Sequence, residues 1–265
     1  MDQTNLAFII SQPRAGSTLL QKILNSHSKV CSPPEPWLML PMSIVRKHDY
    51  KVNFAADHSG TAINQFLRRI PNGDKVYRQA TRDFVFRIYG EFLEQNKAQV
   101  FIDKTPRYYY ILDYLNNMFP HAKFIVLLRH PLDVFVSLRD TFCGRNDRAA
   151  INRSGDSIMG AKKIAAFIDK PVKNRKIIRY EDVVRTPGKT ISEVCSFLGL
   201  DYEPAMLNYG NFNHGNGFGD PKINKSKAPH KKSLGQWRTK LDKKVAKEVI
   251  QKIGPGVIKK LGYNI

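Results

Sequence analysis

The residues best suited to chemistry gather in one short loop near the start of the chain. An apolar run over 6–10 predicts a buried strand, and helical spacing follows it in Leu19, Leu20, Ile23 and Leu24. The first N–H groups of such a helix have no partner within it, and the helix dipole adds partial positive charge there. The loop between them, Pro13-Arg14-Ala15-Gly16-Ser17-Thr18, adds a guanidinium and two hydroxyls. This combination predicts a site for a phosphate-like group.

The loop departs from the pattern that binds nucleoside triphosphates. That pattern is G-x-x-x-x-G-K-S/T, in which the Lys contacts phosphate and the hydroxyl reaches Mg²⁺. Here no Gly stands at the first position and no Lys follows Gly16. The loop therefore lacks residues that a site for a triphosphate and its metal ion needs. An ordinary strand–turn–helix with an N-capping Ser is the alternative interpretation of the same residues.

Two further charged residues stand at the ends of predicted elements. Glu35 is the only acid in a Pro-rich stretch over 30–41, where prolines stiffen the backbone toward an extended path. Lys104 follows the apolar run 100–102, at the carboxyl end of a strand, where open α/β sheets place their ligands. On their own, these residues are also consistent with an exposed loop acid, which is the favoured interpretation of Glu35, and a surface Lys at a helix start.

A second candidate phosphate contact follows the most strand-like segment of the chain. Residues 123–128 are apolar on both faces, as a central parallel strand should be, and they end in Arg129. Pro131 suits the first turn of a helix, and Ser137 lies two turns into it. A guanidinium fork and a hydroxyl placed in this way can grip one phosphate.

Strands and helices must alternate to position these residues. Strands are expected over 6–10, 100–102, 123–128 and 177–182, with helices over 108–119, after Pro131, over 187–198 and from Leu241 to Ile253. Residues 43–98 are expected to be mostly helical, with Phe84, Ile88 and Phe92 in the core.

The alternation of strands and helices predicts an α/β domain over 1–265, with a mostly parallel sheet flanked by helices. Its strand tips then bring Arg14, Lys104, Arg129 and Tyr180 to one edge. The segments 140–160 and 208–236 are expected to be mobile or lid-like.

Composition narrows the class of protein. With 42% hydrophobic residues, 265 residues can build a core of α/β size, and no run of about eighteen apolar residues predicts a membrane span. The N-terminus has no secretory signal, and the three scattered cysteines fit a reducing compartment, so a cytoplasmic protein without a metal site is expected. The formal net charge of +20 is compatible with nucleic acid, an anionic membrane or a polyanionic small molecule. No aromatic-interleaved RNA motif, zinc finger or basic heptad accompanies it.

Five motifs in order resemble one known family. They are Pro-Arg-Ala-Gly-Ser-Thr, Asp-Lys-Thr-Pro, Arg-x-Pro-x-x-x-x-x-Ser, Arg-Tyr-Glu-Asp, and a late basic loop before Trp-Arg. This order resembles the superfamily of sulfotransferases that use 3′-phosphoadenosine 5′-phosphosulfate (PAPS). It is more similar to the bacterial and tyrosylprotein branches than to the cytosolic phenol and steroid enzymes. The resemblance covers most of the chain and implies a P-loop-like three-layer fold.

The resemblance also implies roles for named residues. The donor would be PAPS and the nucleotide product adenosine 3′,5′-bisphosphate (PAP), with no metal required. Glu35 would take the proton of the acceptor, and Arg14 and Lys104 would stabilise charge on the leaving oxygen. The residues implied in donor binding are Arg14, Ala15, Gly16, Ser17 and Thr18 at the 5′-phosphosulfate, Arg129, Ser137, Lys231 and Lys232 at the 3′-phosphate, and Tyr180 near the adenine.

Some features depart from the family pattern and leave alternatives open. The cytosolic branch has a Lys in the first loop and a catalytic His after the second strand, where this chain has Arg14 and Asp-Lys-Thr-Pro. His130 is expected to be a polar residue at a helix start, and the late loop lacks a clean Arg-Lys-Gly.

The alternative functions are a P-loop small-molecule kinase and a non-catalytic basic module that binds polyanions. The expected partner is a small-molecule acceptor rather than a protein or nucleic acid; the sequence does not give the oligomeric state.

Overall fold

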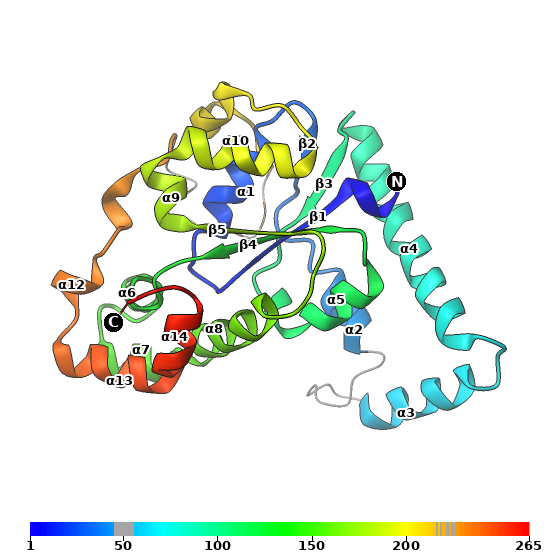
Figure 1. The fold of residues 1–265 in the computed structure, drawn as a ribbon, viewed down its shortest axis with the longest axis horizontal. Helices are drawn as coiled ribbons and strands as arrows, with labels where there is room; N and C mark the ends of the chain where they lie inside the picture. The colour runs from blue at the N-terminus through cyan, green and yellow to red at the C-terminus, as the bar shows by residue number, and fades with distance from the viewer. Residues whose placement is uncertain (45–55, 216, 218, 221–222, 224–225, 265) are drawn as a thin grey trace.

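A five-stranded parallel sheet forms the centre of the molecule (Figure 1). The computed structural model describes residues 1–44, 56–215, 217, 219–220, 223 and 226–264. The strands lie in the order β2-β3-β1-β4-β5, and every neighbouring pair is parallel. Their bounds are β1 Leu6–Ser11, β2 Val30–Cys31, β3 Val100–Asp103, β4 Lys123–Leu128 and β5 Arg175–Arg179. Because the strands are parallel, the loops that follow β1, β3, β4 and β5 meet at one edge of the sheet.

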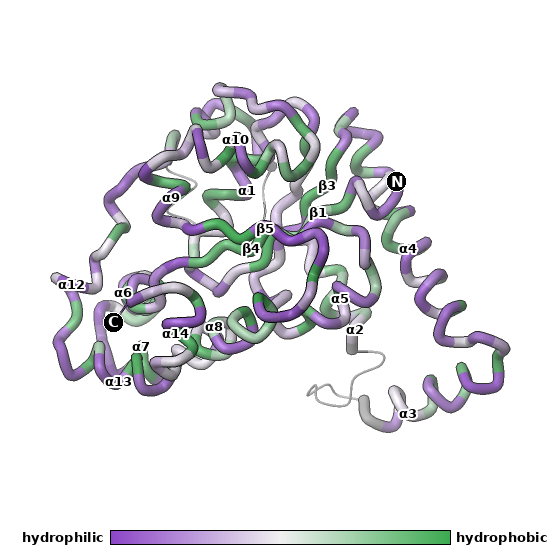
Figure 2. Tube along the Cα trace, in the orientation of Figure 1, coloured by the Kyte–Doolittle hydropathy of each residue, from purple (hydrophilic) through white to green (hydrophobic). Residues whose placement is uncertain are grey.

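Helices cover both faces of this sheet, as the sequence predicts. Successive side chains of β1 point to opposite faces, so Ala7 and Ile9 join one core cluster while Phe8 and Ile10 join the other. The first cluster is closed by α1 (Ser17–Asn25), α9 (Tyr180–Arg185) and α10 (Pro187–Leu198). The second is closed mainly by α5 (Leu112–Met118), α6 (Pro131–Phe142), α8 (Gly155–Ile168), α13 (Lys243–Ile253) and α14 (Pro255–Lys260). Figure 2 shows hydrophobic residues concentrated along the central strands.

The remaining elements lie around this three-layer centre. The helices α3 and α4 reach out to one side of the molecule (Figure 1). The bounds are α2 Met39–Ile44, α3 Ala56–Leu67, α4 Gly73–Gln95, α7 Asp147–Arg153 and α12 Trp237–Lys240, with 3₁₀ turns η1 Gln3–Asn5, η2 Tyr108–Tyr110, η3 Pro204–Asn211 and η4 Lys231–Ser233. In the segment 208–236, residues 216, 218, 221–222 and 224–225 lie outside the described residues, as do residues 45–55 of the stretch 43–98.

The structure differs from the expectations about these elements in three places. Phe84 and Ile88 are 49% and 43% exposed, because α4 buries Val85 and Tyr89, one residue further along each turn. Most of 140–160 is helical, although the sequence shows no regular pattern there: α6 ends at Phe142, and Asn146 caps α7 by accepting a hydrogen bond from the Ala149 N–H. The predicted strand 177–182 ends at Arg179, and Tyr180 begins α9.

Candidate active site

The loop after β1 makes a tight turn that only certain residues can adopt. Arg14 and Gly16 have φ angles of 72° and 100°, in the left-handed region. A Cβ on Gly16 would lie 2.4 Å from the ring of Tyr180, so Gly is required for space as well as for conformation. The Gly16 carbonyl accepts the first helical hydrogen bond, from the Leu20 N–H at 3.1 Å. The N-terminus of α1 therefore opens directly onto the loop.

Arg14 lies at the centre of the candidate site. Its guanidinium donates to the hydroxyls of Ser137 and Thr141 on α6, both at 3.3 Å, and its Nη2 lies 2.8 Å from Asp220 Oδ2. The Asp220 N–H in turn donates to the Thr18 hydroxyl at 3.2 Å. A carboxylate of the protein itself thus occupies part of the cationic loop.

Glu35 and Lys104 form an ion pair across two loops. The Lys104 Nζ lies 2.6 Å from Glu35 Oε1, and the Lys104 side chain is fully buried. Burial lowers the pKa of Lys104, and the charge of Glu35 opposes this shift. Trp37 Nε1 donates to the other Glu35 oxygen at 3.2 Å. Neither residue is the exposed surface charge that the sequence alone allowed.

Arg129 connects the loop after β1 to the late segment (residues 226–240). Its guanidinium donates to the carbonyls of Arg14 at 3.0 Å and Ser233 at 2.7 Å, and it lies 4.3 Å from the ring centroid of Tyr180. Its Nε is buried and has no hydrogen-bond partner among the described residues. Such an unpaired buried donor costs free energy unless a ligand or water completes it.

Two adjoining cavities bring these residues together. The larger, about 250 Å³, is lined by Arg14, Arg129, Ser137 and Tyr180 together with late-segment residues that include Ser233. The smaller, about 100 Å³, is lined by Arg14, Ser17, Thr18 and Glu35 among others. Arg14, Gly16 and Asp220 belong to both. Glu35 and Arg129 therefore stand at the two ends of one continuous site, with Arg14 between them.

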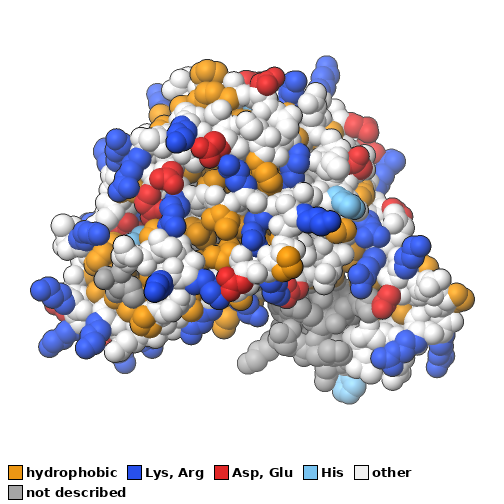
Figure 3. Space-filling model, viewed as in Figure 1, with side chains coloured by type: hydrophobic (Ala, Val, Ile, Leu, Met, Phe, Trp, Pro, Cys, Tyr) orange, Lys and Arg blue, Asp and Glu red, His pale blue; other side chains and the backbone are white. Residues whose placement is uncertain are grey.

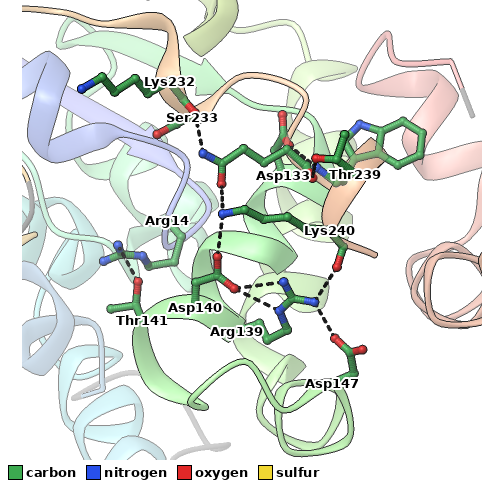
Figure 4. A network of polar contacts seen from close by, with 12 residues as sticks. Arg14, Asp133, Arg139, Asp140, Thr141, Asp147, Lys232, Ser233, Thr239 and Lys240 are labelled. Atoms are coloured by element: carbon green, nitrogen blue, oxygen red, sulfur yellow. Dashed lines mark hydrogen bonds and ion pairs between the residues drawn. The ribbon is translucent and has the colours of Figure 1, made fainter. Parts of the chain in front are cut away.

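The late segment places a different lysine in the lining of the larger cavity from the two that the resemblance implies. Lys231 and Lys232 are exposed and do not line either cavity. Lys240, which is also exposed, lines the larger cavity. Its Nζ donates to Asp140 Oδ2 at 3.0 Å and to Gln236 Oε1 at 2.8 Å (Figure 4). In the sequence, Lys240 could be suspected only weakly as a site residue, from its position at the end of α12 (Trp237–Lys240). No sequence pattern marks Asp140 or Asp220 as site residues.

His130 has the structural role that the sequence predicts. Its Nδ1 accepts from the Leu132 N–H at the start of α6, and its ring stacks on Trp237 with centroids 5.0 Å apart. Burial lowers its pKa, which favours the neutral ring. Asp133 holds the late segment beside it by accepting from the N–H groups of Gly235 and Trp237.

A third, larger cleft adjoins the small cavity. It measures about 420 Å³ and shares Thr18 and Gly219 with the cavity that contains Glu35. Amides and hydroxyls line much of it, from Gln21 and Asn25 on α1, Ser32, and Asn213 and Ser226 of the late coil. Within the described part of the chain, no cluster of residues could hold a metal ion, and no helix is long and apolar enough to cross a membrane.

Comparisons with known proteins agree with the motif order. A family model described as "Sulfotransferase family" matches residues 7–204. Nodulation protein NoeE of Sinorhizobium fredii is 29% identical over 98% of this chain, which spans only 66% of the length of NoeE. Protein-tyrosine sulfotransferase 1 of Danio rerio is 25% identical over 98% of the chain and 72% of its own length.

Solved structures share the same architecture. The sulfotransferase domain from the Synechococcus PCC 7002 olefin synthase superposes with a TM-score of 0.67 and 25% identity, covering all of this chain and 97% of that domain. Mouse SULT7A1 complexed with PAP superposes with a TM-score of 0.53 over 98% of this chain and 89% of its own, at 13% identity. At that identity the second likeness concerns the fold alone.

Proposed function

The chain belongs to the sulfotransferase family, and from that premise we propose that it transfers a sulfuryl group from PAPS to a hydroxyl or amine of an acceptor. One observation carries the proposal: Arg14 joins two adjoining cavities, one with Glu35 and the other with Arg129. A donor with phosphate groups at both ends needs cations at both ends of its site, and an acid where its sulfuryl group meets the acceptor.

Donor binding follows from the groups that line the two cavities. The 5′-phosphosulfate lies at the N-terminus of α1, where unpaired N–H groups, Ser17, Thr18 and Arg14 favour an anion. The 3′-phosphate lies near Arg129 and Ser137, and Lys240 replaces Lys231 and Lys232 as the late-segment cation. The PAP in mouse SULT7A1 supports this class of nucleotide through the shared fold.

The proposed reaction uses Glu35 as the general base. The acceptor oxygen or nitrogen forms a bond to sulfur while the bond from sulfur to the phosphate oxygen breaks, and the acceptor proton passes to Glu35. Arg14 and Lys104 stabilise the negative charge that develops on the departing phosphate oxygen of PAP. Lys104 lines neither cavity but pairs with Glu35, which lines the small one, and because both side chains are largely buried their mutual attraction is stronger than in water.

The proposed acceptor is a small polar molecule. The cleft of about 420 Å³ beside the Glu35 cavity has a volume typical of small-molecule sites. Its amide and hydroxyl lining suits a molecule with several hydrogen-bonding groups rather than an extended apolar one. An acceptor held there would reach the reacting centre past Thr18 and Gly219, which belong to both spaces.

No observation favours the two alternative functions over this one. A P-loop kinase would need the Lys that is missing after Gly16. A polyanion-binding module would be expected to gather its cations in one strip, whereas Lys and Arg side chains are spread over the face shown in Figure 3.

A thermal-shift comparison separates these functions before the acceptor is known. PAP, ATP with Mg²⁺ and a single-stranded oligonucleotide are each added to the protein, since a ligand stabilises the fold that it binds. We expect PAP to raise the melting temperature, and the labelled sulfuryl group of PAPS to appear in a fractionated pool of small molecules. Stabilisation by ATP–Mg²⁺ or the oligonucleotide, with none by PAP, would overturn the proposal.

A further inference from the structure

A buried carboxylate lies behind the proposed general base without touching it. Asp103, the last residue of β3, is fully buried. It accepts hydrogen bonds from the hydroxyls of Tyr89 and Tyr108, both at 2.6 Å, and from Thr105 at 3.0 Å. Tyr89 comes from α4, whereas Thr105 and Tyr108 follow β3 directly. None of these four residues lines either of the two adjoining cavities.

Two of the three hydroxyls continue to the loop that carries Glu35. The Thr105 hydroxyl accepts from the Trp37 N–H, and the Tyr108 hydroxyl accepts from the Met39 N–H, both at 3.3 Å. A hydroxyl has one proton to donate. Thr105 and Tyr108 each donate this one hydrogen bond to Asp103. Their hydroxyl oxygens are therefore left to accept hydrogen bonds from the N–H groups of Trp37 and Met39.

The Glu35 loop has a conformation that needs such support. Glu35 and Trp37 have φ angles of 31° and 57°, in or near the left-handed region that non-glycine residues rarely adopt. Conformations of this kind persist only where the surrounding structure holds them in place. Trp37 is also the residue whose indole N–H binds the Glu35 carboxylate. Fixing the backbone of Trp37 and Met39 therefore fixes the direction of Glu35.

We propose that Asp103 is a positioning residue, which orients Thr105 and Tyr108 so that they hold the Glu35 loop in its reactive conformation. The inference rests on the proposed function in one respect, that Glu35 is the base. The alternative is that Asp103 only stabilises the core. Tyr89 distinguishes the two roles, since it binds the same Asp103 oxygen at the same distance as Tyr108 but has no hydrogen bond to the loop in the described structure.

The test compares Tyr108→Phe with its matched control Tyr89→Phe, and Thr105→Val with Thr105→Ser. For Tyr108→Phe and Thr105→Val we expect kcat to fall about five- to tenfold, the effect of one lost hydrogen bond, with PAP affinity unchanged. Tyr89→Phe and Thr105→Ser should keep kcat within about twofold of the parent protein. Equal losses of kcat in Tyr89→Phe and Tyr108→Phe would assign Asp103 a stability role and overturn the proposal.

A second readout does not depend on catalysis. The chain has two tryptophans, so Trp237→Phe leaves Trp37 as the only indole fluorophore. In that background, Tyr108→Phe and Thr105→Val should increase the quenching of Trp37 by acrylamide, and Tyr89→Phe should not. Unchanged quenching in the first two variants would overturn the positioning role. If the parent protein transfers no sulfuryl group at all, the proposed function fails by itself, and Trp37 quenching still decides whether this cluster holds the loop.

Discussion

The Lys104 ammonium lies 2.6 Å from the Glu35 carboxylate, although their loops are 69 residues apart in the chain. Each loop follows a different part of the sheet, since β3 delivers Lys104 and the Pro-rich segment after β2 delivers Glu35. Burial disfavours the charged form of Lys104 and lowers its pKa, while Glu35 works against this shift. The small cavity is lined by Glu35, and the fully buried Lys104 ammonium lies behind it as its ion-pair partner.

Replacing Glu35 with Gln should abolish most turnover without loss of donor binding. A general base contributes about 10²- to 10⁴-fold to a rate, so we expect a fall of kcat in that range while calorimetric titration gives an unchanged PAP affinity. Glu203→Gln is the matched control, because Glu203 binds Ser28 and His27 and lines neither of the two adjoining cavities. Turnover of Glu35→Gln equal to that of Glu203→Gln would remove Glu35 from the mechanism.

Replacing Asp220 with Asn should tighten the binding of PAP. The Asp220 carboxylate pairs with Arg14 at the junction of the two cavities, so an incoming phosphate must compete with it. Because the pair is partly exposed, we expect a modest gain in affinity of up to about fivefold, smaller at high salt. Asp113→Asn removes the ion pair of Asp113 with Lys170, two residues that line neither cavity, and should leave PAP affinity unchanged. Weaker binding to Asp220→Asn would show that Asp220 supports the loop instead.

Replacing Gly16 with Ala should lower the unfolding free energy by more than the strain of a positive φ angle alone. Gly16 and Gly144 both have positive φ angles, but only at Gly16 would a Cβ meet another residue, the Tyr180 ring at 2.4 Å. Gly144→Ala should cost about 1 kcal/mol of unfolding free energy, the usual penalty for the left-handed region. Gly16→Ala should cost more and should also weaken PAP binding, because the Tyr180 ring must move from beneath Arg129. Equal losses in the two variants, by chemical denaturation, would contradict this account.

The sequence predicts the parts of the fold that local patterning determines. Residues 123–128 were identifiable with their true bounds, because a strand buried on both faces is apolar at nearly every position. The predicted strand 177–182 continues three residues beyond the true end of β5 at Arg179. Tyr180 gives no warning of this, because tyrosine is common in strands and also fits a buried position of a helix. Glu181 and Asp182 stand in the first turn of α9, where acids favour a helix N-terminus, and this was the signal against a strand.

The parts of the site that the sequence missed depend on long-range contacts. Asp220 meets Arg14 across 206 residues, and no local pattern marks it. The resemblance implies Lys231 and Lys232 from the order of the motifs, whereas the folded chain places Lys240, which is also exposed, in the lining of the larger cavity. Likewise, the four-residue spacing of Phe84 and Ile88 shows a helical face without showing which face of α4 is buried.

Replacing Arg129 with Lys should reduce the preference for a 3′-phosphorylated nucleotide. Lys keeps the positive charge but loses the planar fork and the unpaired Nε–H. We expect the ratio of affinities for PAP and adenosine 5′-monophosphate to fall about tenfold or more, as for a lost charged hydrogen bond. Arg148→Lys, at an exposed position on α7, should leave the ratio unchanged. An unchanged ratio in Arg129→Lys as well would place the 3′-phosphate elsewhere.

Replacing Asp103 with Asn should change how stability depends on pH. Burial raises the pKa of the Asp103 carboxyl from 3.8 to about 6, although Tyr108, Tyr89, Thr105 and Lys104 all act to lower it. The folded protein therefore binds this proton more tightly than the unfolded chain, and its contribution to stability is present at about pH 4 and is lost as the pH rises through about 6.

A shift of this size corresponds to about 3 kcal/mol. The unfolding free energy of the parent protein should thus fall relative to Asp103→Asn by up to about that amount between pH 4 and pH 7. Chemical denaturation of both proteins at each pH measures the difference, in which the contributions of the other titrating groups largely cancel. A difference that stays constant, or that grows in favour of the parent protein as the pH rises, would mean that Asp103 remains ionised in the folded core and that its hydroxyl donors outweigh its burial.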